Sequence, residues 1–122
     1  MRNIIFRGKR LDNGEWVEGY LADIITGVQG FEDRAIIVPF GTALAIACDP
    51  ATVGQYTGLK DRYGDRIWEG DLVKHGDEVS EVFFDTENSC FDFKASNDPF
   101  AVQFFCDYEI LGNIHDNPDL LK

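Results

Sequence analysis

Short apolar segments separated by turn-forming residues recur along this chain, a pattern typical of an antiparallel β protein. Residues 4–7 are predicted to form a first strand and residues 16–21 a second. Between them, the dipeptide Asn13-Gly14 accepts the positive φ values that a type I′ hairpin turn requires. The sequence therefore predicts that the chain begins with a β-hairpin.

The second predicted strand carries apolar side chains on both faces. Successive side chains of a strand point to opposite sides of the sheet. Trp16, Glu18 and Tyr20 therefore share one face, and Val17 and Leu21 share the other. A strand of this kind is expected to contact a second layer of the protein or another subunit.

The most regular pattern lies at residues 53–73, where glycines separate short apolar pieces. These glycines, at positions 54, 58, 64 and 70, supply positive φ without steric cost and predict tight turns. Asp71 is expected to cap such a turn through backbone amides, while Leu72 and Val73 enter opposite faces of a strand. The region is predicted to form a small antiparallel barrel.

Two further elements are predicted nearer the C-terminus. Residues 100–108 fit either a buried strand or a short helix, because periodicity does not separate the two over so few residues. Asn117 is suited to cap a single helical turn with Pro118 at its first position.

Composition favours a single domain in a reducing compartment. The chain has 122 residues, of which 44% are hydrophobic, and this is enough to bury one core. It contains no apolar run of roughly 18 residues and no signal-peptide pattern, so a soluble cytoplasmic protein without membrane contact is expected. Cys48, Cys90 and Cys106 are odd in number and widely spaced, which indicates reduced thiols.

The charge is strongly negative, since 22 acidic residues against 11 basic ones give a formal charge of −11. Nucleic-acid-binding proteins usually present a basic face to phosphate. The basic cluster here is limited to Arg2, Arg7, Lys9 and Arg10. Direct nucleic-acid binding is therefore not expected, and the cluster is better suited to pair with acidic groups of a neighbouring subunit.

No reaction centre is evident from the spacing of reactive residues. The possible metal ligands, Cys48, His75, Cys90, Cys106 and His115, form no paired ligand spacing, so no metal or cofactor is expected. No nucleophile elbow or phosphate-binding loop is present. In so acidic a chain, neighbouring carboxylates indicate turn capping and solubility. The sequence therefore predicts a protein that is not an enzyme.

Tyr56, Tyr63 and Trp68 form a candidate ligand or partner surface. Small barrels can bind an extended ligand with exposed aromatic side chains, although Trp and Tyr near turns more often fill the core. Tyr63 lies in the polar turn of residues 60–65 and is expected to be the most exposed of the three. The prediction depends on whether the three rings converge on one surface or turn inward.

Three stretches of the chain resemble the YopX family. They are residues 3–20 with Trp16-Val-Glu-Gly-Tyr20, residues 53–73 with Trp68-Glu-Gly-Asp-Leu-Val73, and residues 111–121 with Leu111-Gly-Asn-Ile-His115. The resemblance implies a small protein encoded by a bacterial phage or prophage, with an SH3-like barrel and no assigned reaction. It also implies one YopX-like domain over residues 1–122. In this domain a β-hairpin and insert (1–52) precede the barrel segment (53–115) and a C-terminal turn (116–122).

Two functional classes are compatible with these features. The first is a non-catalytic accessory protein that binds a host or phage protein or assembles into a homo-oligomer, because all-β chains carry strand edges that subunits can pair. The alternative is an acidic decoy that imitates DNA and occupies a host nucleic-acid-binding protein. An enzyme with a cryptic pocket is a third class, for which the sequence provides no motif.

Overall fold

The structure is a computed structural model that describes residues 4–75, 78–87, 90–93 and 108–121. Its chain contacts define two compact units, Met1–Gln55 and Tyr56–Lys122. The strand pairings described are antiparallel, and the helical segments described are 3₁₀ turns at Pro50–Thr52 and Pro118–Leu121. The predicted all-β, mainly antiparallel fold with short helical turns is thus confirmed.

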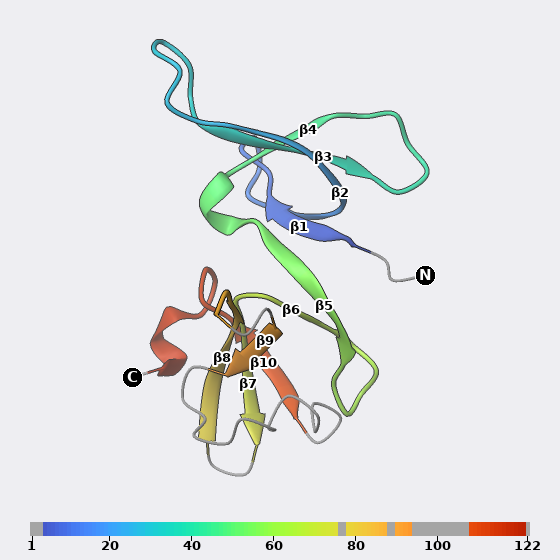
Figure 1. Ribbon diagram of the computed structural model, residues 1–122, viewed down its shortest axis with the longest axis vertical. Helices are drawn as coiled ribbons and strands as arrows, with labels where there is room; N and C mark the ends of the chain where they lie inside the picture. Colours follow the sequence, from blue (N-terminus) through green and yellow to red (C-terminus); the bar gives the residue numbers. More distant parts are fainter. Residues whose placement is uncertain (1–3, 76–77, 88–89, 94–107, 122) are drawn as a thin grey trace. The chain divides into compact units, whose positions relative to one another are not determined.

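The first unit is built around a four-stranded order of β4, β3, β2 and β1 (Figure 1). The elements are β1 (Phe6–Lys9), β2 (Trp16–Ile25), β3 (Arg34–Pro39), β4 (Ile46–Cys48) and the 3₁₀ turn η1 (Pro50–Thr52). The strand β5 (Gly54–Lys60) then begins in this unit and pairs with β1 through Gly54 and Gln55. β1 therefore has β2 on one edge and β5 on the other.

The far end of β1 is also bonded to β4. Leu11 N donates to Ala47 O (3.0 Å) and Asp49 N donates to Lys9 O (2.8 Å). Lys9 N donates to the hydroxyl of Thr52 in η1 (2.9 Å). These bonds join the end of β4 to the end of β1, within the first unit. The predicted SH3-like barrel of residues 53–115 stays a prediction.

The core of the first unit lies on one face of β2, β3 and β4. Its fully buried members are Ala35, Ile37 and Cys48, and the side chains of Val17, Leu21, Ile46 and Val53 pack against them. The predicted division of the second strand into two faces agrees with this packing, because Val17 and Leu21 lie toward the core. Gly8 allows the close packing, since a Cβ there would lie 3.1 Å from both Cys48 Cβ and Ile37 Cδ1.

The first hairpin differs in detail from the sequence prediction. Arg10 N donates to Glu15 O and Gly14 N donates to Arg10 O, each at 2.9 Å, so the loop spans residues 11–14 and is not a two-residue type I′ turn. Gly14 does adopt a positive φ of 72°. The loop is held by hydrogen bonds from Arg10 to Asp12 (2.9 and 2.7 Å), which lower the pKa of the Asp12 carboxyl.

The second unit contains the rest of β5 and a four-stranded sheet of order β10, β7, β8 and β9. The elements are β6 (Arg66–Trp68), β7 (Asp71–His75), β8 (Glu78–Asp85), β9 (Cys90–Phe93) and β10 (Glu109–Asn113). Its core consists of Ile67, Val73, Val82, Phe91 and Tyr108. A turn expected at Thr57-Gly58 is absent from β5, which continues to Lys60; Gly58 has a φ of 86° where the pairing register with β6 shifts.

The predicted C-terminal turn with Pro118 at its first position is confirmed, but the expected capping by the Asn117 side chain is not, because its oxygen accepts from Asn113 N, which precedes the turn. The 3₁₀ turn starts at Pro118, and Leu120 N donates to the carbonyl of Asn117 (3.2 Å). Asn117 also accepts a hydrogen bond from Asn113 N through its side-chain oxygen (3.3 Å). The choice between strand and helix for residues 100–108 lies outside the described residues, apart from Tyr108.

Gly19→Ala is expected to destabilise the first unit by about 1–3 kcal/mol. Gly19 pairs with both Phe6 and Pro39, and a Cβ at this position would collide with the carbonyl group of Val38. This obstacle is backbone and cannot rotate away. The measurement is the midpoint of urea unfolding followed by circular dichroism.

Gly14→Ala is the control for this substitution, because Gly14 has no heavy atom within 4 Å of an added Cβ but does have positive φ. Its cost should reflect only the left-handed backbone, about 1 kcal/mol. Equal losses in the two variants would contradict the steric role of Gly19.

Candidate functional site

The three predicted aromatic residues occupy different environments in the second unit. Trp68 is only 3% exposed and its ring lies 5.5 Å from the ring of Tyr56. The guanidinium of Arg66 lies over the other ring, 5.5 Å from the Tyr56 centroid. Tyr63 is 66% exposed, in agreement with its expected position in a polar turn. Tyr56 and Trp68 are thus brought together as packing, while Tyr63 is the ring that offers surface; the partner surface itself stays a prediction.

A buried carboxylate organises the turn that carries Tyr63. Asp61 Oδ1 accepts the amides of Tyr63 and Asp65, both at 2.9 Å, and its Oδ2 accepts the amide of Ile110 at 3.3 Å. One side chain therefore holds the turn closed and fixes it to β10. A carboxylate engaged by three backbone amides is suited to structure, because its acceptor sites are already used.

Asp71 has a similar role at the next turn. Its Oδ2 accepts the amide of Trp68 at 2.7 Å, across Gly70, whose φ is 91°. Leu72 and Val73 follow as fully buried residues of β7. The predicted function of Asp71 as a turn cap is confirmed, and this explains why a charged residue tolerates almost complete burial.

The candidate metal ligands and nucleophiles show no common site in the described part of the chain. Cys48 is fully buried in the first unit, with Sγ 3.8 Å from the carbonyl of Ile46, and burial raises the pKa of its thiol. His115 belongs to the other unit, next to β10. Cys106 lies outside the described residues, as do the surroundings of His75 and Cys90. Among the described residues, no group of three His, Cys, Asp or Glu side chains could hold a metal ion.

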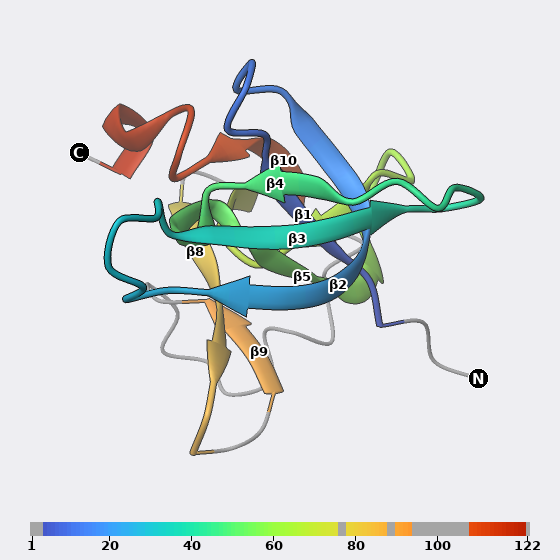
Figure 2. The same cartoon turned by 90° about the horizontal axis from the view of Figure 1, so that it is seen from above.

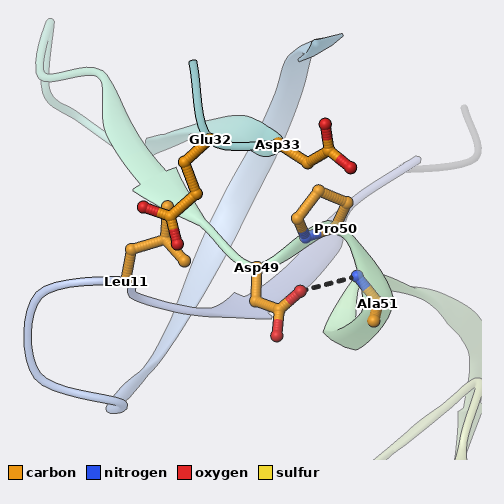
Figure 3. A pocket seen from close by; sticks show the side chains of 6 residues that line it. All are labelled: Leu11, Glu32, Asp33, Asp49, Pro50 and Ala51. Atoms are coloured by element: carbon orange, nitrogen blue, oxygen red, sulfur yellow. Dashed lines mark hydrogen bonds between the residues drawn. The ribbon is translucent and has the colours of Figure 1, made fainter. Parts of the chain in front are cut away.

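A shallow hollow of about 370 Å³ lies in the first unit (Figure 3). Glu32 and Asp33 border it from the segment before β3, and Asp49 borders it from the start of η1. Two of these carboxylates already accept backbone amides: Asp33 accepts that of Gly27 (2.9 Å) and Asp49 that of Ala51 (3.0 Å). The hollow is acidic, but much of its acidity stabilises the local turns.

The outer face of the first unit carries exposed aromatic side chains. On β1 and β2, the Arg7 guanidinium lies 4.5 Å and the Lys9 ammonium 5.5 Å from the centroid of Trp16. Farther along β2, Tyr20 packs edge-on against Phe40 at 4.9 Å. Both rings of this second pair remain exposed. The face left away from the core is thus partly aromatic and offers a surface for another molecule.

The hairpin of β2 and β3 also exposes apolar side chains; we call it the arm and define it as residues 20–36. Figures 1 and 2 show its two strands running side by side to the loop of residues 26–33. Ile24, Val28 and Phe31 are exposed along it. The arm therefore combines strand structure with apolar side chains that the unit itself does not cover.

The chain matches the family model described as YopX protein over residues 6–122. The chain belongs to the YopX family. The resemblance seen in three separate stretches of the sequence is thereby confirmed over nearly the whole chain. A comparison with curated proteins found no match.

A solved structure extends the comparison of this YopX-family chain at the level of the fold. The crystal structure of protein EF1440 from Enterococcus faecalis is similar, with a TM-score of 0.60 and 21% sequence identity. The similarity covers 100% of both chains. At this identity the comparison supports the arrangement of strands alone.

No helix in the described part of the YopX-family chain has the length and apolar character needed to cross a membrane.

The arm is the feature that sequence reasoning missed. The second strand was expected to end at Leu21, whereas β2 continues to Ile25. The apolar pair Ile24-Ile25 could have indicated the longer strand. Asp23 interrupts the alternation, and the pairing register with β3 shifts between Leu21 and Asp23, so the period-two pattern does not extend through it.

Asp61→Ala is expected to lower the free energy of unfolding by about 2–4 kcal/mol, because three backbone amides lose their acceptor. Asp61→Asn should lose less, since it keeps one carbonyl oxygen. Asp65→Ala, in the same turn but exposed, serves as the control and should change stability by less than about 0.5 kcal/mol. Thermal unfolding of the three variants checks this, and a stable Asp61→Ala protein would contradict the structural role of the carboxylate.

Cys48 is expected to react with iodoacetamide at least about tenfold more slowly in the folded protein than in urea, because only an accessible thiolate reacts. The raised pKa also keeps this thiol protonated at neutral pH. Peptide mass spectrometry reports each cysteine separately. Equal rates for Cys48 in native buffer and in urea would contradict its burial in the core.

Proposed function

We propose that this YopX-family protein is a non-catalytic accessory protein of a phage or prophage. It acts in the cytoplasm of the bacterial host by binding a host or phage protein, or further copies of itself. The observation that carries the proposal is the arm, with its exposed Ile24, Val28 and Phe31, together with the exposed Tyr20–Phe40 pair. Exposed apolar side chains gathered on one element are typical of protein–protein interfaces.

The use of polar groups supports a role in binding without catalysis. The buried carboxylates Asp61 and Asp71 accept backbone amides that close turns. A catalytic acid or base needs an environment that sets its pKa for proton transfer and access to substrate. Neither carboxylate is placed in the hollow of the first unit.

The SH3-like barrel implied by the family resemblance is part of this proposal. Support comes from the second unit, where β10, β7, β8 and β9 form one antiparallel sheet and the end of β5 pairs with β6. A barrel of this kind would hold its connecting loops and hairpins on a set of paired strands. Binding would then use the projecting hairpins, with the strands as a rigid support.

The acidic decoy is the second candidate, and the formal charge of −11 favours it. The hollow lined by Glu32, Asp33 and Asp49 places three carboxylates on one surface of the first unit. A decoy would hold a basic host protein through many such charges. Its complexes should therefore weaken steeply as salt rises.

Affinity capture of the tagged full chain from a bacterial lysate, at low and at high salt, distinguishes these candidates. We expect partners or further copies of the chain to remain bound at high salt, because apolar contacts are not screened. Light scattering of the purified protein reports self-association independently. Capture of a nucleic-acid-binding protein that is lost at high salt would instead support the decoy.

A further inference from the structure

The strand β2 is longer than the strand beside it. On one edge, Trp16–Gly19 pair with β1, while on the other edge β2 pairs with β3 as far as Ile25. Within the described residues, no strand pairs with the β1-side edge of β2 from Tyr20 to Ile25. Among the described residues the arm therefore presents an open strand edge, which can hydrogen-bond with a further strand.

The open edge has few of the features that prevent strand pairing. Natural edge strands are usually protected by Lys, Pro or several charges. The run Tyr20-Leu-Ala-Asp-Ile-Ile25 contains a single charge and neither Lys nor Pro. Its protection is local: the amide of Ile24 donates to the carboxylate of Asp23 at 2.8 Å. An incoming backbone carbonyl could replace that carboxylate as the acceptor.

The Nε atom of a neighbouring arginine lacks an acceptor in the described part of the chain. Arg34 lies directly opposite Ile25 on β3, and its Nε is buried without a hydrogen-bond partner. Asp23 is diagonal to Arg34 on the same arm, yet no ion pair joins them in the described structure. A buried donor without an acceptor is costly and calls for a partner. The best complement to this end of the arm is thus a strand that brings a carboxylate.

We propose that the open edge of β2 pairs antiparallel with the same edge of a second copy of the chain. The inference rests on the proposed function, and it names the strand edge through which copies of the chain associate. Isologous pairing uses one edge twice and satisfies the open backbone groups of both copies. A second copy also supplies the carboxylate, because each arm carries its own Asp23.

Charge selects the register of this pairing. With Ile24 opposite Ile24 of the second copy, Asp23 of the second copy lies opposite Ile25, on the face that Arg34 shares. Two strand spacings separate its backbone from that of Arg34, roughly 10 Å, which the two side chains can span. A register centred on Asp23 would instead set two carboxylates against each other, which is unfavourable.

The pairing would also replace the hydrogen bond between Ile24 N and the Asp23 carboxylate with bonds between the two copies. When Ile24 N donates to the second copy, the Asp23 carboxylate is released from that amide. It can then accept a hydrogen bond from Arg34 of the other copy, with the charge of both groups strengthening the bond. The exposed side chain of Ile24 would lie beside Ile24 of the added strand.

The test measures the mass in solution of the purified full chain by native mass spectrometry and light scattering over a range of concentrations. Ile24→Lys places a charge at the open edge, where Ile24 is 50% exposed. We expect its mass to fall to that of one chain, 13.8 kDa, while circular dichroism still reports a folded β protein. Leu44→Lys, at a position 61% exposed outside the arm, is the matched control and should remain associated.

Exchanging the charges tests the register. Asp23→Arg and Arg34→Asp should each weaken association. The double variant should recover most of it, because it again has one positive and one negative group, with their positions exchanged. Hydrogen exchange adds a readout that does not depend on substitution. The amides of residues 22–25 should become protected as the wild-type concentration rises, and Ile24→Lys should abolish this protection.

The outcomes separate the inference from the proposed function. An oligomer that Ile24→Lys leaves intact, without protection at residues 22–25, would overturn the edge pairing and leave self-association standing. A wild-type chain that is monomeric at every concentration would overturn both self-association and the pairing. Protection of residues 22–25 only in a complex with another protein would assign the edge to that protein and overturn pairing with a second copy.

Discussion

The first unit depends on hydrogen bonding along both edges of β1. This strand has only four residues, yet it bonds to β2 on one edge, and to β5 and the end of β4 on the other. The hydroxyl of Thr52 adds a bond to the amide of Lys9 from η1. Because these partners come from residues 16 to 55, none of them can leave without exposing backbone groups of β1. Gly8 lets the core pack directly over this strand.

The open edge of the arm follows from the same geometry. β1 begins at Phe6, opposite Gly19, so beyond Gly19 β2 pairs with β3 alone, while β3 also pairs with β4 from Ala35 to Ile37. From Ile25 and Arg34 to the loop, the described residues add no third strand to the hairpin, and an isolated two-stranded hairpin has little stability of its own. Because β1 is so short, the end of the longer hairpin gains no contacts from it, and contacts with another molecule would stabilise it.

Local signals in the sequence were sufficient where one residue determines the backbone. Asp71 beside Gly70, and Asn117 before Pro118, predicted turns that the structure contains. The apolar alternation at Val17 and Leu21 likewise identified the core face of β2. In these cases the deciding interactions lie within a few residues of each other along the chain, so the sequence pattern contains them.

Long-range contacts could not be predicted in this way. Asp61 looked like an ordinary turn carboxylate, but its third bond goes to Ile110, which is distant in sequence. The burial of Trp68 depends in the same way on strands that join only in the fold.

The effect of the charge on association depends on where the charged residues lie in the fold. A net charge of −11 makes copies of the chain repel one another, so any contact between them must form where local charge is low or compensated. The edge from Tyr20 to Ile25 satisfies this condition, because its single carboxylate lies near a guanidinium that has a buried Nε without an acceptor. Charge elsewhere then opposes other modes of association, and this favours one contact surface over many.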